Sequence, residues 1–204
     1  TITHAYRSTY NIGGYTSNIL FSDDDGDGFT TVRDALGNYL PKYEIAQVSI
    51  TEQFSPLINL DLTWKNSLIT KVEYKKSRNL AVSFSNNQMT EVISGEITVG
   101  TGYRIKDVEF SLSGGKSFKS DLTLKADFSI RNNKTVLRKI VENVDQISAG
   151  QRVYSINLSA EYMLSQKFTI RAFFDKVINN PYISSQFLNS NTNAGISLRF
   201  SLAQ

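Results

Sequence analysis

The sequence predicts an all-β fold, an antiparallel transmembrane β-barrel segment of about eight strands that covers residues 1–204. Apolar and polar residues alternate with period two along most of the chain, as in strands whose two faces meet different surroundings. Short turns alternate with longer polar loops, which is typical of barrels with short periplasmic turns and longer extracellular loops. Aromatic residues gather toward the strand ends, where membrane-interface girdles lie.

The alternation places the strands in order along the chain. The first covers residues 2–12 and precedes a long extracellular loop, residues 13–43, that is rich in Gly, Asp, Asn and Ser. The second, residues 48–64, contains Pro56, and we expect a bulge or kink there because proline cannot donate to the hydrogen-bond ladder. The other strands fall near residues 68–84, 97–105, 122–130, 156–164, 168–174 and 194–202. Their connections are expected at residues 65–67, 86–88, 142–150, 165–167 and 179–190.

The parity of each strand divides its side chains between two faces. In residues 121–131, apolar side chains alternate strictly with polar and charged ones. Charges of both signs suit a hydrated lumen, where they form cross-strand ion pairs. The predicted lumen-facing residues are Arg7, Asp61, Lys71, Glu73, Lys125, Asp127, Arg131, Glu161, Arg171 and Arg199. The predicted lipid-facing residues are Leu122, Leu124, Phe128, Ile130, Ile156, Leu158, Tyr162, Ile196, Leu198 and Phe200.

Three charged residues interrupt the apolar rows. Glu52 stands at an outward position of the second strand, so it must lie at the rim, in a bulge or under a partner protein. Lys76 and Arg78 break the outward row of the third strand and mark a bulge or the membrane rim. These positions are unusual because charge in hydrocarbon is costly.

The composition excludes several kinds of chemistry. Basic and acidic residues nearly balance at 22 and 19, and the two signs alternate along the strands, so no basic stripe indicates a nucleic-acid partner. There is no cysteine, which removes disulfides and thiolate metal sites. The lone histidine, His4, is interpreted as a strand-end residue, since no oriented carboxylate or nucleophile accompanies it. We therefore expect no enzymatic activity.

Two other architectures also fit the pattern. A soluble β-sandwich, acting as a binding module with a calcium loop, alternates in the same way because its inner faces are apolar. A stand-alone eight-stranded outer-membrane barrel of porin or adhesin type is possible because eight strands can close by themselves. The chain opens directly into an alternating strand without an export signal, so we expect it to be the tail of a longer protein.

The long loop contains the spacing of a calcium-binding loop. Residues 23–34 place acids at positions 1, 3, 5 and 12 and a glycine at position 6, as in loops whose oxygens converge on Ca²⁺. This stretch resembles dockerin-like loops, in which aspartate replaces the usual final glutamate. The competing interpretation is a flexible acidic loop tip. The candidate calcium ligands are Asp23, Asp25, Asp27, the Phe29 carbonyl and Asp34.

Four short sequences are similar to one family. They are Glu52–Ile58, Val72–Leu80, Asn179–Ser184 and the ending Thr192–Phe200. Together they resemble the C-terminal end of the SprA/Sov family, the outer-membrane translocon of the Bacteroidota type IX secretion system. The resemblance runs through most of residues 44–204 and is weaker in the long loop.

The resemblance implies the C-terminal end of a 36-strand barrel in the bacterial outer membrane, through which folded cargo proteins are secreted. It also implies an association with gliding motility. The implied partners are the rest of the same translocon chain, an outer-membrane shuttle barrel, a periplasmic plug, a peptidyl-prolyl isomerase, the secreted cargo proteins and the lipid bilayer. No cofactor beyond a possible Ca²⁺ in the loop is implied.

Overall fold

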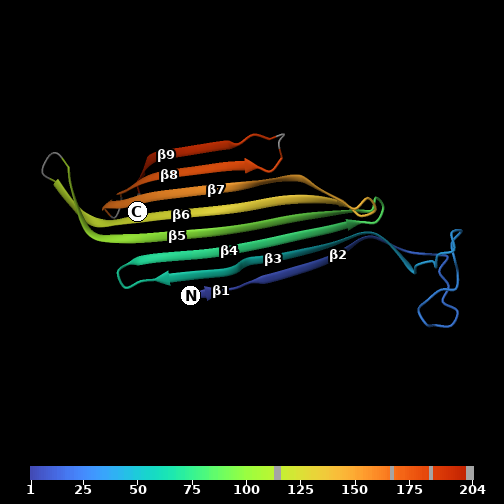
Figure 1. The fold of residues 1–204 in the computed structure, drawn as a ribbon. Helices are drawn as coiled ribbons and strands as arrows, with labels where there is room; N and C mark the ends of the chain where they lie inside the picture. The colour runs from blue at the N-terminus through green and yellow to red at the C-terminus, as the bar shows by residue number, and fades with distance from the viewer. Residues whose placement is uncertain (113–115, 166–167, 184–185, 201–204) are drawn as a thin grey trace.

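The computed structural model describes residues 1–112, 116–165, 168–183 and 186–200. Within these ranges the chain is all β, with nine strands in one antiparallel sheet and no helix (Figure 1). The strands are β1 (Ile2–Thr3), β2 (Tyr6–Ser17), β3 (Tyr43–Thr63), β4 (Leu68–Ser83), β5 (Gln88–Leu112), β6 (Lys116–Lys139), β7 (Val144–Ser165), β8 (Phe168–Pro181) and β9 (Asn189–Phe200).

The nine strands occupy eight positions across the sheet. Strands β1 and β2 both pair with β3, so they form one edge that is interrupted at residues 4–5, and each later strand pairs with the next in sequence. The other edge is β9. The sequence prediction of about eight antiparallel strands is therefore confirmed at the level of the sheet, and the sheet itself is open.

The bulge predicted at Pro56 is confirmed. The register between β3 and β4 shifts between Phe54 and Ile58, which pair with Lys76 and Tyr74 respectively. On the other side of β3, the Ala5 amide donates to the Pro56 carbonyl at 2.9 Å. The irregular stretch of β3 therefore coincides with the break between β1 and β2.

Several predicted boundaries were wrong, because backbone pairing continues beyond the apolar rows. Strand β2 continues to Ser17 and pairs with the start of β3, so the long loop is residues 18–42 rather than 13–43. The predicted loops at 142–150 and 179–190 shorten to 140–143 and 182–188. The turn at 65–67 is confirmed, with the Trp64 amide donating to the Leu68 carbonyl at 2.8 Å. At the predicted turn 165–167, residues 166–167 lie outside the described ranges.

The connections define two ends of the sheet. We call the end with the 64–67 turn the turn end, and the end with residues 18–42, 84–87, 140–143 and 182–188 the loop end. The prediction that short turns and long loops alternate strictly was wrong, since 84–87 and 140–143 are no longer than 64–67. Among the connections that the structure describes in full, only 18–42 is a long excursion, and it extends away from the strands at the loop end (Figure 1).

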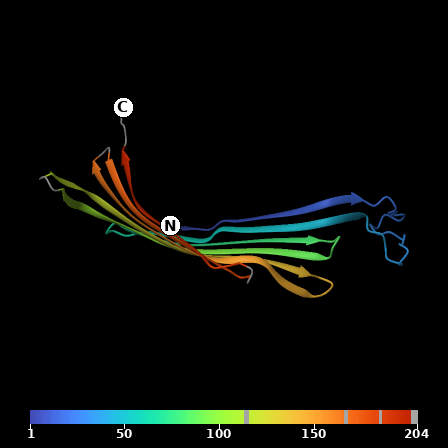
Figure 2. The ribbon, with the colours of Figure 1, turned by 90° about the horizontal axis from the view of Figure 1, so that it is seen from above.

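The sheet has no conventional core. Seen from above it is twisted and curved, with the strands fanning apart at the loop end (Figure 2). In the part of the chain that the structure describes, Val136 is the only buried apolar side chain, at 7% exposure. A search of the same residues for a helix long and apolar enough to cross a membrane finds none.

Candidate functional site

One face of the sheet carries the charged residues. Directly paired residues in antiparallel strands share a face, and one such row joins Asp61, Lys71, Gly100 and Asp127 across β3 to β6. We call this face the polar face. All ten residues predicted from the sequence to line a lumen lie on it: Arg7, Asp61, Lys71, Glu73, Lys125, Asp127, Arg131, Glu161, Arg171 and Arg199.

Ion pairs link charges across the polar face. The Glu73 carboxylate lies 3.4 Å from the Lys71 ammonium and 3.1 Å from that of Lys75. The Arg131 guanidinium donates to both oxygens of Glu96 on the neighbouring strand, at 3.0 and 3.1 Å. Because these pairs are partly exposed to solvent, each contributes little to stability. Their effect is to present a mixed, nearly neutral polar surface.

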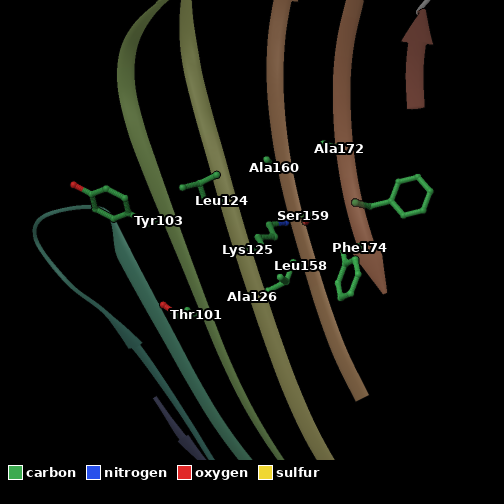
Figure 3. Close-up of a pocket in the computed structure, with 11 residues that line it drawn as sticks. Thr101, Tyr103, Leu124, Lys125, Ala126, Leu158, Ser159, Ala160, Ala172 and Phe174 are labelled. Carbon is green, nitrogen blue, oxygen red and sulfur yellow. The ribbon is translucent and has the colours of Figure 1, made fainter. Parts of the chain in front are cut away.

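The opposite face is mainly apolar, with Lys176 of β8 as a charged residue inside it, in the same row as Ile156. Its central row joins Tyr103, Leu124, Ala160, Ala172 and Ile196 across β5 to β9. The small side chains leave a hollow of about 530 Å³ in this face, visible between Tyr103, Leu124 and Phe174 (Figure 3). All ten residues predicted from the sequence to face lipid lie on this apolar face: Leu122, Leu124, Phe128, Ile130, Ile156, Leu158, Tyr162, Ile196, Leu198 and Phe200.

The apolar face is exposed and limited in extent. Ile196 is 74% exposed, and Leu198 and Phe200 are each 64% exposed. On β6 the apolar positions run from Leu122 to Ile130, and Asn132 follows on the same face. That band matches the roughly 9–11 residues that a tilted strand needs to cross a membrane. Strand β6 itself is much longer than its apolar band.

A charged network lies on the apolar face toward the loop end. Arg78 bridges two carboxylates, with its Nε 2.6 Å from Glu91 and an Nη 3.7 Å from Glu52. Arg138 also donates to Glu91, at 2.8 Å, and lies 3.7 Å from Asp145. Glu91 is only 4% exposed, although both arginines are partly open to solvent. We call these five residues the charged network.

The network explains the outward Glu52 and revises the sequence interpretation. Glu52 pairs directly with Arg78 in a regular part of the β3–β4 ladder, so it does not lie in a bulge. Strand β4 pairs with β5 without a shift at Lys76 and Arg78, but on the β3 side Lys76 pairs with Phe54 and borders the register shift, so the bulge expected there is present next to Lys76. The sequence analysis missed Glu91, although its parity in β5, opposite Leu80, places it on the apolar face. Strict parity counting could have found it.

The acidic loop brings together three of the five candidate calcium ligands. Carboxylate oxygens of Asp23, Asp25 and Asp27 lie within 4.8 Å of one another. Asp23 accepts hydrogen bonds from two glycine amides of the loop, and Asp27 accepts one from the Phe29 amide at 2.8 Å. The Phe29 side chain is exposed.

Asp34 lies in a separate turn. Its carboxylate accepts hydrogen bonds from the Leu36 amide and from both the amide and the side chain of Asn38. The hydrogen bonds from Asn38 hold the pKa of Asp34 below its ordinary value. Hydrogen bonds within this turn therefore occupy the carboxylate oxygens of Asp34. The calcium site stays a prediction.

Limited digestion with trypsin at Arg33 tests the calcium prediction. The Arg33 guanidinium donates to the Gly37 carbonyl at 3.0 Å and to the Tyr39 hydroxyl at 2.6 Å, so the cleavage site belongs to the same folded loop. If Ca²⁺ binds, millimolar calcium should slow this cleavage, as expected for an extracellular loop of moderate affinity. Asp25→Asn should remove the protection. Cleavage that calcium leaves unchanged would contradict the prediction.

His4 lies at the break between β1 and β2. Its Nδ1 is 2.6 Å from the Leu57 carbonyl oxygen, and its ring lies 6.2 Å from that of Phe54. This position agrees with the interpretation of His4 as a strand-end residue.

Comparison with known proteins gives no family assignment. No family model matches this chain, and no curated protein matches it. The function is therefore inferred from the two faces of the sheet and from the sequence resemblance.

Proposed function

We propose that this chain forms part of the wall of an outer-membrane β-barrel, with the apolar face against lipid and the polar face lining a water-filled conduit. The observation that carries the proposal is a single sheet whose apolar face has no layer packed on it among the described residues. Exposing so continuous an apolar surface to water is unfavourable. Lipid removes that cost without a second protein layer.

The soluble sandwich explains the same face less well. A sandwich buries its apolar rows between two sheets, whereas all nine strands described here belong to one. The apolar band on β6 also stops at Asn132 while the strand continues. A band of fixed height within longer strands is expected where a membrane of fixed thickness meets the wall.

The two open edges favour a larger wall over a small closed barrel. In hydrocarbon every backbone N–H and C=O must be paired, so a membrane wall tolerates no free edge. In the described part of the chain β9 pairs with β8 alone, and β1 and β2 pair with β3 alone. Further strands at both edges would satisfy these groups, as the resemblance to a 36-strand barrel implies.

The function that we propose for this wall is secretion of folded proteins across the outer membrane, in a translocon of the type IX kind. The support is the resemblance of residues 44–204 to the translocon family, together with the balanced charge of the polar face. A surface with both charge signs, some of them engaged in ion pairs, presents no strong field of one sign to passing proteins. The proposal requires no covalent chemistry from this chain.

A neighbouring pair of residues on β7 tests both parts of the proposal. Leu158 lies on the apolar face and Ser159 on the polar face. In outer membranes containing the full-length protein, a membrane-impermeant thiol reagent should label the Ser159→Cys variant and spare Leu158→Cys. Detergent unfolding should make both react. Equal labelling in the intact membrane would refute the facing assignment.

Photo-crosslinking at the same positions tests secretion. A photoreactive residue in place of Ser159 should capture secreted proteins in transit, whereas one in place of Leu158 should capture lipid. If position 159 is accessible to the thiol reagent but captures no exported protein, the wall belongs to a porin-like barrel and the translocon function is wrong. A protein that partitions into buffer without detergent would support the soluble binding module instead.

A further inference from the structure

The loop-end margin of the apolar face carries cations that no acidic residue neutralises. Lys76 and Arg152 lie in one row across the sheet, and Lys134 lies one step further toward the loop end. The next row toward the turn end joins Tyr74, Ile97, Ile130, Tyr154 and Ile178. We call Lys76, Lys134 and Arg152 the basic belt. On β6 and β7 it begins where the apolar band ends, whereas on β4 Leu80 and Val82 continue the apolar row beyond Lys76.

The three belt side chains are exposed and free of carboxylate partners. Across the described ranges, no carboxylate lies within ion-pair distance of Lys76 or Lys134. The Arg152 Nε donates to the neutral Asn132 side chain at 2.8 Å. The nearby carboxylates Glu52 and Glu91 are already engaged by arginines of the charged network. The belt therefore keeps three positive charges without carboxylate partners in two neighbouring rows of the sheet.

A glycine leaves open space beside Lys76. Gly95 lies between Lys76 and Asn132 in the same row, and Gly150 is directly opposite Lys134. The space beside Gly95 is open, since a Cβ there would meet only the Tyr74 hydroxyl at 3.7 Å, whereas Gly150 is packed against the Tyr182 ring and the backbone of β6. Tyr182 donates to the Asn132 side chain at 3.0 Å, which places further polar groups beside Arg152. The surface at this level combines cations and amides with bare backbone.

We propose that the basic belt binds the phosphate groups of lipid headgroups in the membrane leaflet at the loop end. The inference rests on the proposed membrane wall, since it needs acyl chains against the apolar band. Headgroup phosphates then lie at the level of the belt, and lysine and arginine side chains at an interface extend toward them. Both side chains pair well with phosphate oxygens.

Charge complementarity and position favour lipid over a protein partner. The belt is continuous with the apolar band, so one molecule with an acyl chain and an anionic phosphate contacts both surfaces. Tyr74 and Tyr154 form the boundary between them, which is where amphipathic rings lie in membrane proteins. An acidic protein would meet the cations and leave the apolar band uncovered.

A matched pair of variants on β6 tests the belt. Lys134 is on the apolar face and Lys125 on the polar face, both exposed and both without an ion pair within the described ranges. The full-length protein is purified in a neutral detergent and titrated with phosphatidic acid or phosphatidylcholine, and native mass spectrometry counts the bound lipids. Lys134→Gln should weaken phosphatidic acid binding by roughly fivefold. Lys134→Arg should retain it, and Lys125→Gln should leave it unchanged.

The outcomes separate this inference from the proposed function. Labelling at positions 158 and 159 in the same preparations reports whether the wall is inserted as proposed. If insertion holds but the wild type binds both lipids equally, or Lys125→Gln weakens binding as much as Lys134→Gln, the phosphate belt is wrong and the wall stands. If the two positions label equally, the membrane wall itself is wrong.

Discussion

Leu124→Arg should destabilise the folded protein in a membrane by about 2–4 kcal/mol, whereas Lys125→Leu should have only a mild effect. Leu124 lies in the middle of the apolar band, directly between Tyr103 and Ala160 (Figure 3). An arginine there would place its charge at the depth of the acyl chains, too far from either interface for full hydration. Lys125 is on the opposite face, paired with Gly102 and Ser159, where an apolar side chain meets a polar surface without a large penalty.

Urea unfolding in lipid vesicles, followed by gel mobility of heated and unheated samples, measures both effects. The two substituted positions are adjacent, so differences in strand propensity or position are small compared with the expected difference in free energy of unfolding between the two variants. As a conservative control, Leu124→Met should leave the free energy of unfolding nearly unchanged, because methionine keeps the volume and the apolar character. Similar costs for Leu124→Arg and Lys125→Leu would contradict the assignment of the faces.

Glu91→Gln should destabilise the protein by about 1.5–3 kcal/mol, the range for hydrogen bonds to charged groups. Glu91 is 4% exposed and accepts from Arg78 at 2.6 Å and from Arg138 at 2.8 Å. An amide in its place can still accept hydrogen bonds, but it removes the nearest counter-charge of both arginines and leaves them only the more distant Glu52 and Asp145, each at 3.7 Å. Because both arginines are partly open to water, the cost stays below that of a fully buried ion pair.

Two controls make this result specific. Glu142→Gln removes the carboxylate of an exposed pair with Lys139 and should change stability by no more than about 1 kcal/mol. Replacing the centre, with Glu91→Leu, Arg78→Met and Arg138→Met together, should be less harmful than Glu91→Gln alone, since the only carboxylates that then lose their arginine, Glu52 and Asp145, are open to solvent. If the triple variant is less stable than Glu91→Gln, the three charged side chains stabilise the sheet, and the explanation by an uncompensated charge is wrong.

The sequence predicted the two faces well because their signal is local. Side-chain direction alternates with every residue of a strand, so Leu122 to Ile130 could be assigned to one face without knowing the neighbouring strands. The bulge at Pro56 could also be predicted locally, since proline has no amide hydrogen to donate to the ladder of any strand that contains it. The coarse fold, an antiparallel sheet of eight positions, follows from these local patterns together with short connections.

The features that the sequence could not predict depend on pairing between distant segments. Glu91 and Arg138 are 47 residues apart, and only the register between β5 and β6 brings them together. The end of β2 at Ser17 was hidden because its last residues are polar on both faces and are held by the partner strand. Asp34 fitted a calcium spacing in sequence, yet its carboxylate is held by Asn38, a contact that spacing alone does not reveal.

The two bare edges have a consequence for the width of the proposed conduit. The diameter of a closed barrel grows with the number of its strands, and every strand added between β9 and β2 enlarges the circumference while leaving the pairing within β2 to β9 unchanged. In such a wall, the residues of this chain set the surface chemistry along one arc. If the proposed barrel forms, the calibre of its opening is set by how much polypeptide completes the ring.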